Sequence, residues 1–171
     1  MSDLNQKAES YVDHILIAAR CGDKSSGLWR NMLDNWNCYS IGHPFVANRG
    51  AGQPRWFNKA NVNKMRPMLE LMHRRSKLAD QMIQRQQGDI VVVDHVVPVN
   101  VLRDILIERS HELTRDTTRD FLRNYYRLCV ITPDEHDRLN SKSFHQERRE
   151  PSDFWGRYES AGIELMEMVA A

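Results

Sequence analysis

The residues that could do chemistry gather in two short stretches of the sequence. The first holds Asp94 and His95, and the second holds His136 with Asn140 four residues further on. Carboxylate, imidazole and amide groups bind divalent cations. A neutral imidazole can also accept a proton near neutral pH, since the unperturbed pKa of histidine is about 6.5. The two stretches therefore predict a site that combines a bound cation with a general base.

A short strand is expected to carry the first stretch. Residues 90–93 form an unbroken β-branched run between Gly88 and Pro98, which predicts a buried strand rather than a helical turn. Asp94 and His95 then stand at the end of this strand. Because successive strand side chains point to opposite faces, one of the two can bind a metal while the other addresses a different partner.

A helix is expected to carry the second stretch. Thr132 is a favourable N-cap, Pro133 suits the first helical position, and Glu135 completes the capping-box pattern. The helix is thus predicted to begin at Pro133. His136 and Asn140 then lie on one face, where they can share one ion.

The segment between these two stretches completes the local arrangement. Residues 128–131 are a second short apolar run and are expected to pair antiparallel with residues 90–93. Apolar residues recur at helical spacing within residues 99–126, which predicts two helices inserted between the strands. The expected order is therefore strand, helical insertion, strand, helix.

This arrangement resembles the HNH, or ββα-metal, nuclease family. The sequence Asp-His-x-x-Pro that begins at Asp94 is similar to the first motif strand of that family. Residues 130–136, with Asn140 one turn further on, are similar to its second strand and helix, especially in colicin-type DNases. The resemblance spans roughly a third of the chain. It implies an α+β fold, mostly α, with a helical scaffold around a small ββα-metal motif.

The resemblance also implies a role for individual residues. Asp94 and His136 would be metal ligands, and Asn140 stands at the position of a third ligand. His95 would be the general base that takes a proton from the attacking water. The ion would polarise the scissile phosphate and stabilise charge on the leaving oxygen. Arg127 stands where the family usually has an asparagine that braces the loop; it could instead contact a phosphate, or form a solvated salt bridge.

The donor set and the cysteines bear on the identity of the metal. Carboxylate, imidazole and amide oxygen together favour Mg²⁺ or Mn²⁺, whereas imidazoles alone would favour Zn²⁺ or Ni²⁺. Cys21, Cys38 and Cys129 are widely spaced and form no Cys-x-x-Cys pair, so the zinc knuckles of many relatives are absent. Their odd number argues against a disulfide framework, and Cys129 is expected in the core.

The net charge of +1 is distributed unevenly along the chain. Residues 41–86 are rich in lysine and arginine, while residues 87–171 are net acidic. Residues 42–57 predict a long basic loop, which can hold phosphates with its cations and stack bases with its aromatic rings. In the alternative interpretation, those rings anchor the loop to the core. The expected nucleic-acid contacts are Arg49, Arg55, Trp56, Lys59, Arg74 and Arg75.

Helices are expected over most of the remaining sequence. They are predicted over residues 4–19, 26–36, 67–83 and 154–168. Gly22 can end the first helix and Ser26 can cap the second. Arg74 and Arg75 are expected on the basic face of the third, opposite its methionine-rich stripe.

The chain is expected to form one domain with three segments. Residues 1–86 would be a helical region with the basic loop, residues 87–145 the ββα-metal motif, and residues 146–171 a C-terminal helix packed on the same domain. The sequence shows neither an apolar signal segment nor a long apolar run. It therefore favours a soluble, cytoplasmic protein without a membrane partner.

These features together predict a small metal-dependent endonuclease that hydrolyses DNA, with a restriction, phage, homing or defence role. A homodimer would cut both strands, whereas a monomer would nick one. Two alternatives remain open. One is a nucleic-acid-binding or regulatory module on a degenerate HNH scaffold without efficient cleavage. The other is a helical interaction protein in which Asp94, His95 and His136 are ordinary polar core residues.

Overall fold

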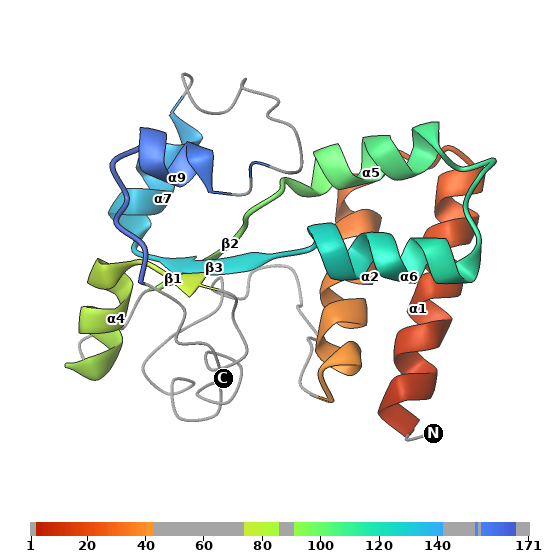
Figure 1. Cartoon of the computed structure of the whole chain (residues 1–171), viewed down its shortest axis with the longest axis horizontal. Coiled ribbons are helices and arrows are strands. Elements are labelled where there is room, and N and C mark those ends of the chain that lie inside the picture. Colours follow the sequence, from red (N-terminus) through yellow and green to blue (C-terminus); the bar gives the residue numbers. More distant parts are fainter. Residues whose placement is uncertain (1–2, 43–73, 86–90, 142–152, 154, 167–171) are drawn as a thin grey trace. The chain divides into compact units, whose positions relative to one another are not determined.

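The computed structural model describes residues 3–42, 74–85, 91–141, 153 and 155–166. It has an α+β fold that is mostly helical (Figure 1). The chain forms two compact units, and neither is continuous in sequence. One unit comprises Met1–Ala51 and Val97–Tyr126, and the other comprises Gly52–Val96 and Arg127–Ala171. The helical insertion thus belongs with the N-terminal helices, whereas both expected strands belong to the second unit.

The first unit is built from four amphipathic helices among its described residues. They are α1 (Asp3–Arg20), α2 (Ser26–Ser40), α5 (Val99–Glu108) and α6 (Arg115–Tyr125). Helix α1 packs along α2 and also contacts α5 and α6. The buried faces include Trp29, Leu33 and Leu102, each fully shielded from solvent. These helices confirm the ones predicted over residues 4–19 and 26–36 and the two predicted within residues 99–126. Gly22, in the turn that ends α1, has a left-handed φ of 65°.

The second unit contains a small mixed sheet. Strand β2 (Val92–His95) pairs antiparallel with β3 (Leu128–Ile131), as predicted. A third strand, β1 (Arg74–Arg75), pairs parallel with β3, so that β3 is central. Helices α4 (Lys77–Gln84), α7 (Pro133–Asn140) and α9 (Gly156–Ser160) complete the described part of this unit. Strand β2 begins at Val92, two residues later than expected, and extends to His95. Asp94 and His95 are therefore its last two residues.

The helix expected over residues 67–83 is confirmed from Lys77 onward but is wrong at Arg74 and Arg75. Arg74 and Arg75 form β1, and α4 begins only at Lys77. Ser76 separates the two elements: its backbone N–H donates to the carbonyl of Val130, and its hydroxyl accepts from the N–H of Ala79. Hydrogen bonding to the sheet and a favourable N-cap therefore prevail over the helical periodicity of the sequence.

The C-terminal helix is also shorter than the sequence predicts. Helix α9 ends at Ser160, and Gly162 adopts a left-handed φ of 66°. The N–H of Ile163 donates to the carbonyl of Tyr158, and that of Gly162 to Glu159, which together form a Schellman motif. Beyond this turn Leu165 forms an antiparallel bridge with Ser76. The described segment after Gly162, which ends at Met166, thus pairs with the chain around β1 instead of continuing the helix.

The left-handed turn at Gly162 leads to a stability prediction. Gly162→Ala is expected to lower the free energy of unfolding by about 1–2 kcal/mol, because a residue with a Cβ is strained in this conformation. The added Cβ would lie 3.8 Å from the guanidinium of Arg138, which is an ordinary contact, so the cost comes from the backbone. Urea unfolding followed by circular dichroism measures the change.

Gly27→Ala is the matched control for this substitution. Gly27 lies in α2 with open space around its Cβ position, so alanine there is expected to stabilise by roughly 0.5–1 kcal/mol. If Gly162→Ala also stabilised the protein, the left-handed turn after α9 would be ruled out.

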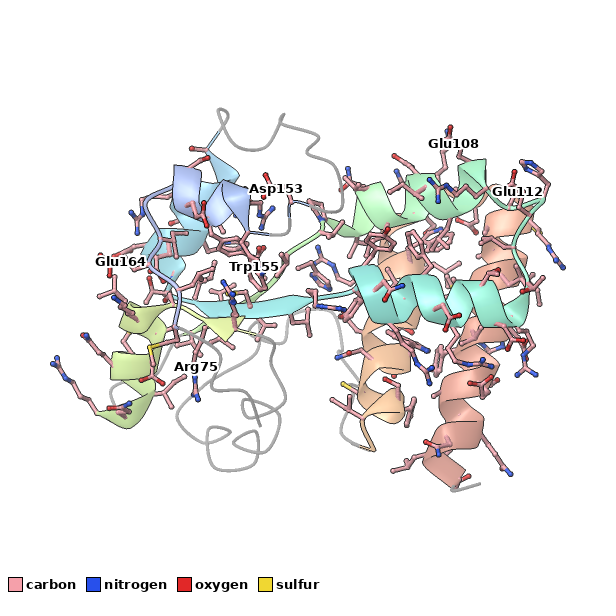
Figure 2. The ribbon with its side chains drawn as sticks, viewed as in Figure 1. Arg75, Glu108, Glu112, Asp153, Trp155 and Glu164 are labelled. Atoms are coloured by element: carbon pink, nitrogen blue, oxygen red, sulfur yellow. The ribbon has the colours of Figure 1, made fainter. Side chains whose placement is uncertain are left out.

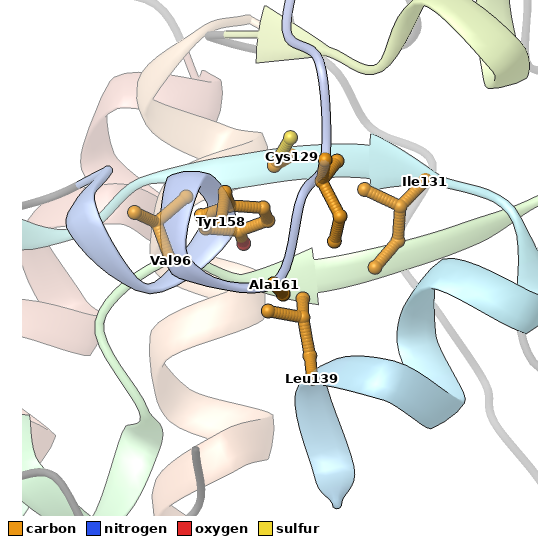
Figure 3. Close-up of a cluster of buried hydrophobic side chains, with 7 residues drawn as sticks. Val96, Cys129, Ile131, Leu139, Tyr158 and Ala161 are labelled. Carbon is orange, nitrogen blue, oxygen red and sulfur yellow. The ribbon is translucent and has the colours of Figure 1, made fainter. Parts of the chain in front are cut away.

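A buried apolar cluster joins the sheet to α7 and α9. Its members are Val96, Cys129, Ile131, Leu139, Tyr158, Ala161 and Ile163. Figure 3 shows Tyr158 from α9 over β3, with Leu139 reaching in from α7. Cys129 is a buried strand residue, as expected, and burial raises the pKa of its thiol far above the usual range. Both helices therefore cover the face of the sheet on which Cys129 lies.

Candidate functional site in the sheet unit

Asp94 and His95 lie on opposite faces of β2. Asp94 stands directly across from Cys129, and His95 stands across from Leu128. Since paired residues on neighbouring strands point to the same face, Asp94 shares the face of Cys129 that α7 and α9 cover. His95 is half-buried on the other face, at the last position of the strand. The expected separation of the two side chains is thus observed.

Two donors from α9 hold the carboxylate of Asp94. The guanidinium of Arg157, through Nη2, and the hydroxyl of Tyr158 both donate to Oδ2, the latter at an O···O distance of 2.6 Å. The side chains of Asp94 and Arg157 are 14% and 18% exposed, so water screens this ion pair little. Hydrogen bonds to an ionised carboxylate are stronger than those between neutral groups. Asp94 is therefore fixed in one orientation.

Both donors stay protonated at neutral pH. Burial by itself would lower the pKa of Arg157, but the neighbouring charge of Asp94 and the hydrogen bonds raise it overall. The pKa of Tyr158 lies well above its usual range, mainly because the side chain is buried and also because Asp94 lies next to it. The carboxylate thus faces a permanent cation and a permanent hydroxyl donor.

Helix α7 is fixed to the sheet at its first turn. The capping box predicted from sequence is present: Thr132 accepts from the N–H of Glu135 at 3.3 Å, and Glu135 accepts from that of Thr132 at 2.8 Å. The same carboxylate oxygen, Oε2, also accepts from the hydroxyl of Ser76 at 2.6 Å. Ser76 and Glu135 are both buried, so this contact joins α7 to the turn between β1 and α4.

His136 and Asn140 contact each other on α7, as their spacing predicts. The side-chain nitrogen of Asn140 lies 3.0 Å from each of the two ring nitrogens of His136. The lone-pair directions of these nitrogens diverge, so an atom equidistant from both is in line with neither. The amide of Asn140 thus contacts the imidazole of His136 without donating squarely to either nitrogen. His136 is half-buried and Asn140 is exposed.

The predicted ligands are only partly brought together. Within the described ranges, no hydrogen bond or ion pair joins Asp94 to His136, and no group of three or more His, Cys, Asp and Glu side chains could hold a metal. The predicted set has two such side chains and the amide of Asn140. Its oxygen and nitrogen donors suit a hard divalent cation, and the Oδ1 atom of Asp94 accepts no hydrogen bond from the described residues. The donor types of the predicted set are therefore those that Mg²⁺ and Mn²⁺ prefer.

Arg127 lies next to the first residue of β3. Its carbonyl accepts from the N–H of Val96 at 3.0 Å, which continues the hydrogen bonding between β2 and β3. Partial burial lowers the pKa of the Arg127 guanidinium. The two strands thus stay hydrogen-bonded up to the residue before β3.

The nucleic-acid residues expected from sequence fall into two groups. Arg49, Arg55, Trp56 and Lys59, with most of the basic loop, lie outside the described residues. Arg74 stacks on Trp155 with its guanidinium carbon 4.6 Å from the ring centroid, and Arg75 pairs with Asp80 at 3.2 Å. Figure 2 shows Trp155 on the side of the sheet where α9 lies. Arg74 and Arg75 thus belong to a strand whose cations already have partners.

Arg157 and Tyr158 were not recognised from the sequence as part of this site. Both lie in a segment that the apolar pattern assigns to a helical scaffold, and Tyr158 fits that pattern because its ring is buried. The only indication is an arginine next to a buried tyrosine, which is common in amphipathic helices. Their contact with Asp94 depends on long-range packing.

Comparison of the chain with protein-family models, with curated proteins and with solved structures found no match. Among the described residues, no helix is both long enough and apolar enough to cross a membrane. The function of the site is therefore argued from its own residues.

Proposed function

We propose that this protein is a metal-dependent endonuclease that hydrolyses phosphodiester bonds in DNA. The observation that supports the proposal most is the order of the second unit: the antiparallel pair β2 and β3 leads directly into the capped helix α7. Asp94 and His95 end the first strand, and His136 and Asn140 lie on the helix. The carboxylate and imidazole at the end of β2 and the imidazole and amide on α7 thus belong to one small unit, which supports the proposal.

Each residue has one task in the proposed reaction. Asp94, His136 and Asn140 would hold one divalent cation, Mg²⁺ or Mn²⁺ in preference to Zn²⁺ or Ni²⁺. The chemistry that a bound cation supplies is polarisation of the phosphate and stabilisation of charge on the leaving oxygen. His95, on the other face at the strand end, accepts a proton from the attacking water. Its position leaves the carboxylate of Asp94 to serve as a ligand.

The proposed partner is DNA, bound in part by the basic segment that contains Arg49 and Arg55. A restriction, phage, homing or defence role fits a small nuclease of this kind. A dimer would make a double-strand break and a monomer would nick. Arg127 at the position of the family's asparagine adds a cation next to β3 that could contact a phosphate.

One observation favours a second function. The negative charge of Asp94 is already balanced by Arg157, which reduces its attraction for a cation. A DNA-binding or regulatory module that keeps the scaffold without efficient cleavage would show this feature. Cleavage distinguishes the two functions, because both would bind DNA.

Incubation of supercoiled plasmid with the purified full chain tests the proposal. We expect relaxed or linear product with Mg²⁺ or Mn²⁺ and none after chelation, because charge on the leaving oxygen would then lack its counter-cation. The four metals Mg²⁺, Mn²⁺, Zn²⁺ and Ni²⁺ are compared by gel electrophoresis, and a gel-shift assay measures DNA binding. Binding without product in any metal would contradict the nuclease and support the binding module. Absence of both would contradict the two functions together.

A further inference from the structure

The contacts of Asp94 are unusual for a buried arginine–carboxylate pair. Such pairs are frequently bidentate, with one guanidinium nitrogen on each carboxylate oxygen. Here Arg157 and Tyr158 both donate to Oδ2, and Oδ1 accepts no hydrogen bond from any described residue. The two donors thus hold one oxygen and leave the other open.

The contact that Arg157 makes with Asp94 leaves one of its own donors without a partner. Its Nε atom is buried and has no hydrogen-bond partner among the described residues. A buried donor without a partner is destabilising, and a bidentate contact that used Nε would avoid this penalty. The packing of α9 therefore favours the single-oxygen contact over the one that satisfies more donors.

Tyr158 fixes the same oxygen from a rigid position. Its ring is fully buried in the apolar cluster with Cys129 and Leu139 (Figure 3). Its hydroxyl is the polar end that reaches Asp94. Cys129 is also the strand partner of Asp94. The donor Tyr158 packs against β3, and the acceptor Asp94 lies on the strand that pairs with β3. The carboxylate of Asp94 therefore has little freedom to rotate.

We propose that Arg157 and Tyr158 are positioning residues that hold Asp94 by Oδ2 and so present Oδ1 to the divalent cation of the site. This inference rests on the proposed nuclease function and deepens it. The two residues act through Asp94 and do not touch substrate. Partners that orient a metal-binding side chain in this way affect metal affinity by about 10–100-fold.

Binding of Mn²⁺ to the full chain tests the proposal without any need for cleavage. Electron paramagnetic resonance of free Mn²⁺ gives the dissociation constant. We expect Tyr158→Phe and Arg157→Lys each to weaken binding about 10–100-fold. Lysine keeps the charge but lacks the planar fork of arginine, so Arg157→Lys removes orientation without removing the cation. Asp94→Asn is expected to abolish binding, and adding Tyr158→Phe to it should have no further effect.

Tyr126→Phe is the matched control. Tyr126 is also buried and donates its hydroxyl to an aspartate, Asp34, at 2.7 Å, but it belongs to the other unit. The same chemical change there should leave Mn²⁺ binding unaltered. Thermal unfolding checks that each variant is folded. If Tyr158→Phe fails to fold, Arg157→Lys provides the test.

The possible outcomes separate the positioning role from the nuclease function. If Tyr158→Phe and Arg157→Lys bind Mn²⁺ like the wild type while Asp94→Asn does not, the positioning role is overturned and the metal site stands. If Asp94→Asn also binds normally, or the wild type binds no Mn²⁺, the metal site and the positioning role are overturned together. In cleavage assays, positioning variants should need more metal for half-maximal rate yet approach the wild-type rate at saturation.

Discussion

Replacing His95 by alanine is expected to lower the rate of DNA cleavage by about 10²–10⁴-fold at saturating metal, the usual contribution of a general base. The loss should appear in the maximal rate, because His95 lies on the face of β2 opposite Asp94 and is assigned no part in metal binding. The Mn²⁺ dissociation constant and DNA binding should stay at wild-type values. Tyr158→Phe is expected to do the reverse: it should weaken Mn²⁺ binding but approach the wild-type rate at saturating metal.

Single-turnover cleavage of plasmid at saturating Mg²⁺ or Mn²⁺ measures the effect. His111→Ala is the control, since His111 is an exposed histidine of the other unit and pairs with Glu112, its neighbour in sequence. It should cleave like the wild type. Product formed at the wild-type rate by His95→Ala would remove the proposed base and leave the catalytic role to another residue. A loss of Mn²⁺ binding in His95→Ala would instead make His95 a ligand.

Local rules were sufficient where neighbouring residues determine the structure. The capping box at Thr132 and Glu135 places the start of α7 correctly, because both partners lie within one helical turn. The run from Leu128 to Ile131 forms the predicted strand, because four consecutive apolar residues suit the buried centre of a sheet. The i, i+4 spacing of His136 and Asn140 likewise predicts their contact.

The same rules fail where distant segments pair. Arg74 and Arg75 have a helical context in the sequence, but β1 forms because its backbone pairs with β3 and with the segment after Gly162. The end of α9 depends on the left-handed turn at Gly162, which the apolar stripe does not reveal. For the same reason Arg157 could not be assigned to the site. Its partner Asp94 lies on another element, and only tertiary packing brings the two together.

The link between Ser76 and Glu135 is a further long-range contact, and it leads to the largest stability effect that we predict. Glu135→Ala is expected to lower the free energy of unfolding by about 2–4 kcal/mol. The substitution leaves the hydroxyl of Ser76 and the N–H of Thr132 buried without their shared acceptor. Ser76 is fully buried, so water cannot easily replace the carboxylate. Helix α7 would keep its N-cap at Thr132 but lose the reciprocal bond of the capping box and its connection to the turn before α4.

Asp134→Ala provides the matched control, because Asp134 is the neighbouring acid in the same first turn but is exposed. Its loss should cost only about 0.3–1 kcal/mol, the usual effect of a carboxylate near a helix N-terminus. Ser76→Ala combined with Glu135→Ala should destabilise less than the sum of the two single changes, because the double variant leaves no buried hydroxyl without a partner. Urea unfolding of the wild type and the four variants measures these differences. Strict additivity would contradict the Ser76–Glu135 hydrogen bond, and with it the connection between α7 and the turn before α4.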